Sequence, residues 1–231
     1  MDWKSDVKAL TFDLFGTVMD IRGSTLPATR TYLEKKNSDL KAEQFWDVFR
    51  VRQRLEQYQD NILMLGHSGY RQAVRRAFIH TSRLLVGEPS EDEVKEYLKA
   101  WDGLQPFPEV IAGLERLKDR YKLVVLSNGE PEFLQHLVDD NVKWKFDDII
   151  SVQTAGEFKP SPAVYRKAAF ILGLEAGECM MISSNSFDIV GARACSFRAG
   201  FVNRTNAPLE VSSYLPDVQV SDFTELANAL L

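Results

Sequence analysis

The chain has 231 residues, a formal net charge of −5 at pH 7 and 45% hydrophobic residues. This composition is typical of a soluble globular protein, and the acidic balance argues against nucleic-acid binding, which usually needs a basic face. No apolar run approaches the length of a membrane span, and the first residues lack the apolar segment of a secretory signal. Cys179 and Cys195 lack CxxC spacing, so we expect reduced thiols in a cytoplasmic protein. From the charge and the hydropathy we expect neither a nucleic-acid partner nor a membrane partner.

Six short apolar runs predict buried strands, and helix-length segments separate most of them. In chain order, the strands are expected at 7–12, 122–126, 148–152, 179–182, 199–202 and 218–220. This alternation predicts strand–helix–strand units on a parallel sheet. Two helix starts are also marked, by Pro131 at a first-turn position and by Asp222 with Glu225 at capping-box spacing.

The interval after the first strand is different, because three helix-periodic segments follow one another without a strand between them. They cover 42–58, 70–85 and 90–101, and the last begins with Ser90 and Glu93 at capping-box spacing. Such an insertion predicts a cap over the carboxyl ends of the strands, where open α/β sheets bind ligands. We therefore expect an α/β fold with a Rossmann-like core and parallel sheet (1–21 and 101–231) and an inserted all-helical cap (22–100).

Four short polar stretches come just after predicted strands, so a parallel sheet would gather them at one edge. They are Asp13-Leu14-Phe15-Gly16-Thr17, Ser127-Asn128-Gly129, Lys159-Pro160, and Ser183-Ser184-Asn185 followed by Phe187-Asp188. Each alone is common in turns and loops. Their order along the chain is what predicts a site.

These stretches resemble the four motifs of the haloacid dehalogenase superfamily, and they look most like those of the L-2-haloacid dehalogenases. The hallmarks are an aromatic residue two positions after the first aspartate, Leu-Ser-Asn-Gly, Lys-Pro followed by tyrosine, and Ser-Ser-Asn followed by aspartate. Here they read Phe15, Leu126 to Gly129, Lys159 with Tyr165, and Ser183 to Asn185 with Asp188. The resemblance covers essentially the whole chain, and it implies hydrolysis of short 2-haloalkanoic acids. Homodimers are common among such dehalogenases, so a homodimer is one expectation for this chain, although no interface stripe is visible in the sequence.

Phe15 bears on the leaving group. Phosphatases of the superfamily carry a second aspartate at this position, which protonates an alkoxide as it departs. Halide is a weak base that leaves carbon without a proton, and an aromatic ring helps to build a dry pocket for an alkyl halide. A carboxylate beside a lysine is a suitable covalent nucleophile, so Asp13 with Phe15 favours carbon–halogen cleavage.

Motif four bears on metal binding. The phosphatases carry Gly-Asp where this chain has Ser184-Asn185, which leaves Asp13 and Asp188 as the motif carboxylates. Mg²⁺ prefers carboxylates together with substrate phosphate oxygens. With Lys159 as a fixed positive charge, we expect a site without metal or cofactor.

The resemblance and this chemistry imply a reaction in two steps. Asp13 would displace halide from a 2-haloacid with inversion, and water would then attack the Asp13 ester and release a 2-hydroxy acid. The resemblance also implies roles for the other residues. Asp13 is steadied by Lys159 and Thr17, and Lys159 is supported by Tyr165. The substrate is bound by Ser127, nearby backbone N–H groups and Asn128, and water is positioned by Asn185, Ser183 and Asp188.

The family binds the departing halide with a cap arginine, the motif-four asparagine and an aromatic residue, here Phe187. Candidates for the arginine are Arg50, Arg52 and Arg54, which helical periodicity cannot place on one face together. Arg50 is preferred because it follows an aromatic residue, as the family arginine does. Phe15 and Phe187 stand where many relatives carry tyrosine and tryptophan, so halide preference and substrate size stay open.

Plainer interpretations also stay open. Asn128 is readily explained as a turn former, Ser183 as a turn hydroxyl, Tyr165 as a core residue and Arg50 as part of a solvated helix face. For the whole protein the alternatives are a Mg²⁺-dependent phosphatase of the same superfamily and a non-catalytic binding relative, because a scaffold does not determine a substrate.

Overall fold

The computed structural model of the chain describes residues 3–209 and 211–231. Its strands are β1 (Ala9–Phe12), β2 (Lys122–Ser127), β3 (Asp148–Ser151), β4 (Cys179–Ser183), β5 (Arg198–Val202) and β6 (Val218–Val220). Its helices are α1 (Ile21–Lys35), α2 (Ala42–Ile62), α3 (Tyr70–Leu85), α4 (Glu91–Asp102), α5 (Val110–Leu117), α6 (Pro131–His136), α7 (Pro162–Leu172), α8 (Ser186–Ala194) and α9 (Phe223–Leu230). Short helical turns lie at η1 (Trp3–Ser5), η2 (Leu137–Val142), η3 (Val152–Ala155) and η4 (Ala176–Glu178).

The strands form one parallel sheet in the order β3-β2-β1-β4-β5-β6. Phe12 at the end of β1 pairs with Val125 on one side and Ile182 on the other, so the carboxyl ends of three strands lie level. The chain leaves β1 toward β2 on one side and reaches β4 on the other. This reversal of strand order creates a crevice at the carboxyl end of β1, the usual ligand site of open α/β sheets.

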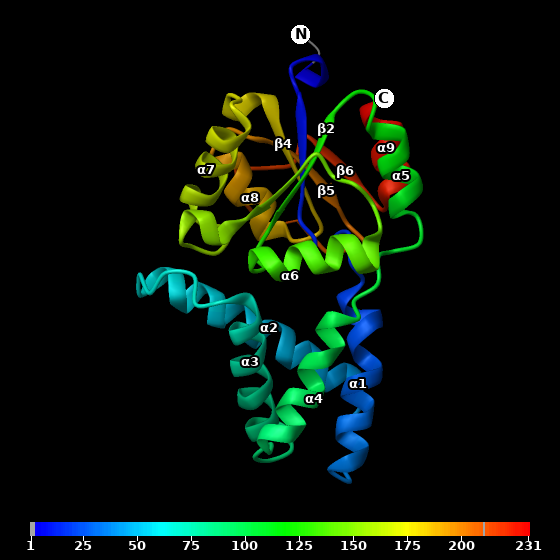
Figure 1. Cartoon of the computed structure of the whole chain (residues 1–231), viewed down its shortest axis with the longest axis vertical. Coiled ribbons are helices and arrows are strands. Elements are labelled where there is room, and N and C mark those ends of the chain that lie inside the picture. Colours follow the sequence, from blue (N-terminus) through cyan, green and yellow to red (C-terminus); the bar gives the residue numbers. More distant parts are fainter. Residues whose placement is uncertain (1–2, 210) are drawn as a thin grey trace.

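Helices cover both faces of the sheet, with α7 and α8 on one side and α5 and α9 on the other (Figure 1). The central strands are buried on both faces, and Phe12 stacks on Phe223 of α9 with ring centres 5.7 Å apart. Asp222 caps α9 by accepting a hydrogen bond from the Glu225 N–H (2.8 Å), and Pro131 begins α6. The six predicted strands and both helix starts are confirmed.

Helices α1 to α4 form a separate lobe at the carboxyl ends of the strands (Figure 1). Ser90 and Glu93 cap α4 reciprocally, as predicted. The fold class, an α/β core with an inserted helical cap, is confirmed. The helices of this lobe run from Ile21 to Asp102, slightly beyond the predicted 22–100, and the division into domains stays a prediction.

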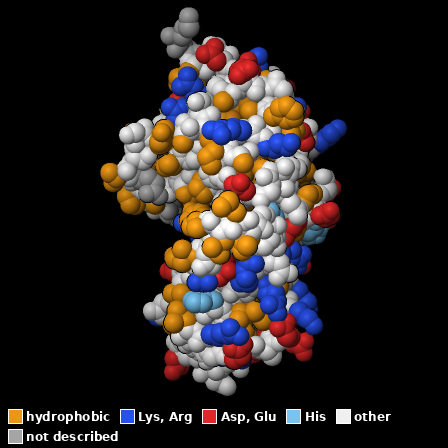
Figure 2. All heavy atoms as spheres, turned by 90° about the vertical axis from the view of Figure 1, so that its left-hand side faces the viewer, with side chains coloured by type: hydrophobic (Ala, Val, Ile, Leu, Met, Phe, Trp, Pro, Cys, Tyr) orange, Lys and Arg blue, Asp and Glu red, His pale blue; other side chains and the backbone are white. Residues whose placement is uncertain are grey.

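Apolar side chains are exposed on the face that carries α7 and the end of α2 (Figure 2). They include Ile62 at the end of α2, Leu63, Met64 and Leu65 directly after it, and Phe170 on α7, which is 77% exposed. The homodimer stays a prediction. Both cysteines are free thiols, and burial raises the pKa of Cys179 to about 12. No helix in the described part of the chain combines the length and apolarity needed to cross a membrane.

Candidate active site

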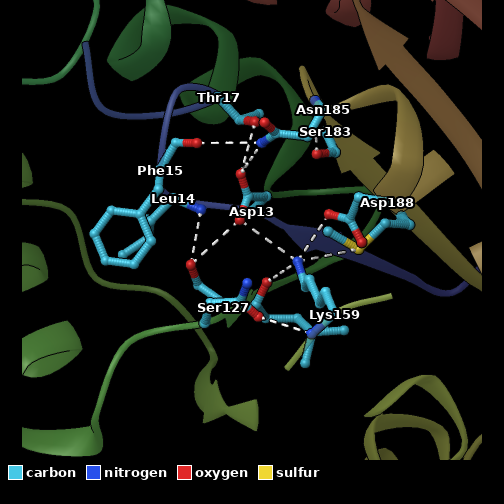
Figure 3. Close-up of polar contacts among 12 residues, drawn as sticks. Asp13, Leu14, Phe15, Thr17, Ser127, Lys159, Ser183, Asn185 and Asp188 are labelled. Atoms are coloured by element: carbon cyan, nitrogen blue, oxygen red, sulfur yellow. Dashed lines mark hydrogen bonds and ion pairs between the residues drawn. The ribbon is translucent and has the colours of Figure 1, made fainter. Parts of the chain in front are cut away.

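Asp13 lies directly after β1, where its N–H still pairs with Ile182 O (3.0 Å). The residue is 4% exposed, and its carboxylate has two partners on each oxygen (Figure 3). Oδ2 accepts from Thr17 Oγ1 (3.0 Å) and Asn185 Nδ2 (3.0 Å). Oδ1 accepts from Ser127 Oγ (3.3 Å) and lies 3.5 Å from Lys159 Nζ. The carboxylate is thus held in one orientation by groups from all four motifs.

The turn after Asp13 explains part of this arrangement. Gly16 has φ +90°, a left-handed conformation that disfavours other residues. The chain reverses there and brings Thr17 back to Asp13. The Thr17 hydroxyl also accepts from the Ser184 N–H (2.8 Å), so it connects the first motif to the fourth.

Lys159 lies between two carboxylates and is 1% exposed. Its Nζ donates to Leu126 O (2.6 Å) and to Asp188 Oδ2 (2.9 Å), besides its ion pair with Asp13. Tyr165 Oη donates to the other oxygen of Asp188 (2.6 Å). Burial and the Asp188 charge both raise the pKa of Tyr165 well above its ordinary value, so Tyr165 keeps its proton. Tyr165 acts on the site through Asp188.

The pKa of Asp13 is raised above its ordinary value, chiefly by burial. Lys159 is the largest opposing influence, the negative charge of Asp188 adds to the increase, and the Thr17 hydrogen bond and Arg50 lower the pKa. A carboxylate that burial makes costly to ionise is also poorly solvated. Once ionised, it faces a reacting atom without a water shell to remove.

A small cavity lies over Asp13, with a volume of about 10 Å³, which is room for about one water molecule. Residues from the cap and from all four motifs line it: Asp13, Phe15, Arg50, Arg54, Gln57, Tyr70, Asn128, Lys159, Asn185, Phe187 and Asp188. Three cationic side chains therefore face two carboxylates. The excess of one positive charge suits a single anion.

The three candidate arginines do not share one face of α2, as helical periodicity predicts. Arg50 and Arg54, one helical turn apart, both line the cavity, whereas Arg52 Nε donates to Glu56 Oε1 (2.7 Å). Arg50 Nη1 donates to Gln53 Oε1 (2.6 Å) within α2.

Three cavity residues do not figure in the sequence-based site: Tyr70, Gln57 and, as the less favoured arginine, Arg54. Tyr70 stacks on Phe15 with ring centres 3.9 Å apart and planes 7° apart. A signal for the other two exists, because Arg50, Arg54, Gln57 and Asn61 occupy one face of α2 at helical spacing. A polar stripe on a helix that packs against the core indicates a site beneath it.

The second motif does more than form a turn. Asn128 Nδ2 donates to Gln57 Oε1 (2.9 Å) of the cap, while its Oδ1 accepts from the Lys159 N–H (3.0 Å). Asn61 of α2 also meets the third motif, donating to Phe158 O (2.7 Å) and accepting from the Phe158 N–H (2.9 Å). These bonds join the cap to the loops that carry Lys159.

Ser183 supports the backbone of Asn185. It is fully buried, and its hydroxyl accepts from the Asn185 N–H (3.1 Å). Gly191 of α8 has a similar role, because a Cβ there would come within 2.7 Å of Tyr165 Oη and of Pro160 Cβ. Glycine at this position lets Tyr165 reach Asp188.

Comparison with known proteins agrees with this geometry. A model of the haloacid dehalogenase-like hydrolase family matches residues 7–196. The (S)-2-haloacid dehalogenase of Xanthobacter autotrophicus is 32% identical over 199 residues, 86% of this chain and 76% of that protein. The (S)-2-haloacid dehalogenase H-109 of Pseudomonas putida is 28% identical over 97% of this chain and 98% of its own. The solved structure of the X. autotrophicus L-2-haloacid dehalogenase with covalently bound chloropropionic acid superposes with a TM-score of 0.85 at 27% identity, covering 97% of this chain and 98% of that one.

The fold is a Rossmann-like α/β core with an inserted helical cap, and the site at the carboxyl ends of its strands fits a hydrolase with an aspartate at its centre. The chain belongs to the haloacid dehalogenase-like hydrolase family, whose model matches well over half of its length. The resemblance seen in the four motifs is thereby confirmed.

Proposed function

We propose that the protein hydrolyses short 2-haloalkanoic acids to 2-hydroxy acids, with inversion and without a metal ion. The observation that carries this proposal is the pairing of a buried carboxylate, Asp13, with an aromatic residue at the position of a general acid. Phe15 is 3% exposed and stacked on Tyr70, so it forms an apolar wall. The names of the relatives support the same activity.

In the first step, an oxygen of Asp13 attacks C2 of the substrate from the side opposite the halogen. The new C–O bond forms as the C–X bond breaks, and the electron pair leaves with the halide. Arg50 lies beside the cavity to receive that anion, together with Asn185 and Phe187. The Ser127 hydroxyl is fully buried and donates to Asp13 in this structure (3.3 Å), so it must turn from Asp13 to bind the substrate carboxylate together with adjacent N–H groups. The excess positive charge of the cavity offsets the charge of that carboxylate.

In the second step, water adds to the carbonyl carbon of the Asp13 ester. The bond from that carbon to the alkyl oxygen breaks, which returns the carboxylate and releases the 2-hydroxy acid with a proton. Each Asp13 oxygen already has two partners, so either one can carry the negative charge of the tetrahedral intermediate. Only the first step touches C2, and a single inversion results.

Lys159 supports a reaction without metal. Its Nζ stands 3.5 Å from Asp13 and 2.9 Å from Asp188, so an ammonium group holds the place between the two motif carboxylates. Among residues 3–209 and 211–231, no three His, Cys, Asp or Glu side chains gather in a group able to hold a metal ion. The fixed cation offsets the charge that a metal would otherwise neutralise.

One experiment tests the proposal. The protein is incubated with each enantiomer of 2-chloropropionate and with p-nitrophenyl phosphate, with and without EDTA, and halide and phosphate release are measured. We expect EDTA-insensitive chloride release from one enantiomer, loss of this release in Asp13→Asn, and wild-type rates in the matched control Asp6→Asn. Phosphate release that depends on Mg²⁺, without chloride release, would establish the phosphatase alternative. Release of neither halide nor phosphate from any substrate would favour a non-catalytic binding relative.

The covalent step has its own test. A single turnover in ¹⁸O-labelled water should place the label in Asp13, because water attacks the ester carbonyl. Label that enters the 2-hydroxy acid directly would refute the ester.

A further inference from the structure

We propose that Arg54 is a positioning residue: it ties the cap to the turn after β4 and holds the Asn185 side-chain amide with its NH₂ group toward Asp13. The inference rests on the dehalogenase function proposed above. It gives the second cap arginine a task different from that of Arg50.

The contacts of Arg54 run from α2 to the core. Its Nη2 donates to Asn185 Oδ1 (3.2 Å), and its guanidinium carbon lies 5.4 Å from the centre of the Phe187 ring. A cation over an aromatic face is attracted by the ring. Tyr58, also on α2, meets the same ring edge-on at 5.9 Å. Two residues of one helix therefore hold Asn185 and Phe187 in place.

These contacts decide which way the Asn185 amide points. Its Nδ2 donates to Asp13 Oδ2 (3.0 Å) and to Phe15 O (3.2 Å), both of which can only accept. A guanidinium can only donate. Rotating the amide by half a turn would oppose oxygen to oxygen on one side and donor to donor on the other. Arg54 thus opposes the rotation and polarises the amide that serves the nucleophile.

Arg50 and Arg54 differ in where their hydrogen bonds go. The bond from Arg50 to Gln53 stays within α2, whereas the bond from Arg54 to Asn185 crosses from cap to core. The Arg54 bond therefore forms only when the cap is closed over the site.

Arg54 also stands where two cavities meet. A larger cavity of about 450 Å³, lined in part by Trp46, Phe107 and Arg204, shares Arg50, Arg54 and Asn185 with the small cavity over Asp13. The Arg54–Asn185 bond joins two of the shared residues and so lies at the boundary between the two cavities. We expect closure of this boundary and orientation of the amide to occur together.

The test compares Arg54→Met and Arg54→Lys with Arg52→Met and Arg52→Lys, the same substitutions on the same helix outside the cavity. Halide release from 2-chloropropionate gives kcat and KM across pH. We expect Arg54→Met to lower kcat by about 10- to 100-fold with a smaller effect on KM, as for a misaligned reacting group. Arg54→Lys should recover part of the loss, and both Arg52 variants should stay within about threefold of wild type.

The pH profile gives a second readout. A hydrogen bond to the ionised form lowers a carboxyl pKa, so a loosened Asn185 raises the pKa of Asp13 and moves the acidic limb of kcat/KM to higher pH. The other groups facing Asp13 are unchanged in these variants: Lys159, Asp188, Arg50 and Thr17. Arg54→Met also removes a positive charge from the cavity, so Arg54→Lys, which keeps that charge, is the variant in which a shift of the acidic limb reports on Asn185 alone.

A double-mutant cycle with Asn185→Ala tests whether Arg54 affects kcat through Asn185. If Arg54 acts through Asn185, Arg54→Met costs little further kcat in the Asn185→Ala background. Additive losses, a rise in KM alone, or wild-type kcat in Arg54→Met would each overturn the inference while leaving the dehalogenase function intact. A wild-type protein that releases no halide from any 2-haloacid would instead overturn the proposed function, and this inference with it.

Discussion

The pKa of the Asp13 carboxyl group is set by opposing influences. Burial raises its pKa, while Lys159, the Thr17 hydroxyl and Arg50 lower it. In the proposed reaction the group must be ionised to attack carbon, so we expect activity above the pKa of Asp13 and its loss as pH falls through that pKa. We therefore expect the donors around the carboxylate to set the acidic limit of activity.

Thr17→Val tests this balance, because it removes the hydroxyl that donates to Asp13 Oδ2 (3.0 Å) and keeps the shape. Losing the donor raises the pKa of Asp13, so we expect the acidic limb of kcat/KM to move to higher pH by up to about one pH unit. The matched control is Thr11→Val, a buried threonine of β1 that bonds Met180 O. An acidic limb at the same pH in Thr17→Val and wild type would contradict this account.

Among the elements, strands and helix caps follow from local sequence, and residues such as Asp222 and Ser90 mark their ends. The motifs follow from their places after strands. The side of α2 that faces the core cannot be predicted from local sequence, because it depends on tertiary packing. This is why the structure is needed to place Arg54 in the site beside Arg50, and why Asn128 is interpreted as a turn former until Gln57 is seen beside it. Tyr70, the first residue of α3, likewise reaches Phe15 only through tertiary packing.

The packing of α8 against Tyr165 makes Gly191 sensitive to any side chain. In Gly191→Ala the new methyl group would meet Tyr165 Oη and Pro160 Cβ at 2.7 Å. We expect a loss of about 1–3 kcal/mol in the free energy of unfolding, together with lower kcat as Tyr165 moves from Asp188. Urea denaturation and halide release measure the two effects. Gly177→Ala, where a Cβ meets nothing within 4 Å, should leave both unchanged, and equal results for the two variants would refute the packing argument.

At the scale of the whole molecule, the cap helices and the core meet at a cavity with room for about one water molecule. A haloacid is larger than that, so under the proposed function we expect the cap and the core to separate to admit it. The hydrogen bonds between Asn61 and the Phe158 backbone hold the closed form near Lys159. We expect the strength of these bonds to influence how often the site opens.

Asn61→Ala should loosen this junction. Losing two hydrogen bonds of about 1 kcal/mol each should raise amide hydrogen exchange at Phe158 by about 10- to 30-fold and raise KM. Gln59→Ala, at an exposed position on the same helix, is the control and should match wild type. Unchanged exchange at Phe158 in Asn61→Ala would show that other contacts keep the lobes together.

The sheet order has a consequence for synthesis of the chain. β1 is made first but lies in the middle of the sheet, between β2 and β4. The nascent chain therefore carries Asp13 long before the ribosome delivers Lys159, Asn185 and Asp188. Helices α1 to α4 contact one another through neighbouring segments, so we expect them to fold early, as locally connected structure does. Thr17, Ser127 and Lys159 precede β4, but Asn185 reaches Asp13 only after β4 has emerged and paired with the open edge of β1, so we expect activity to begin only near the end of translation.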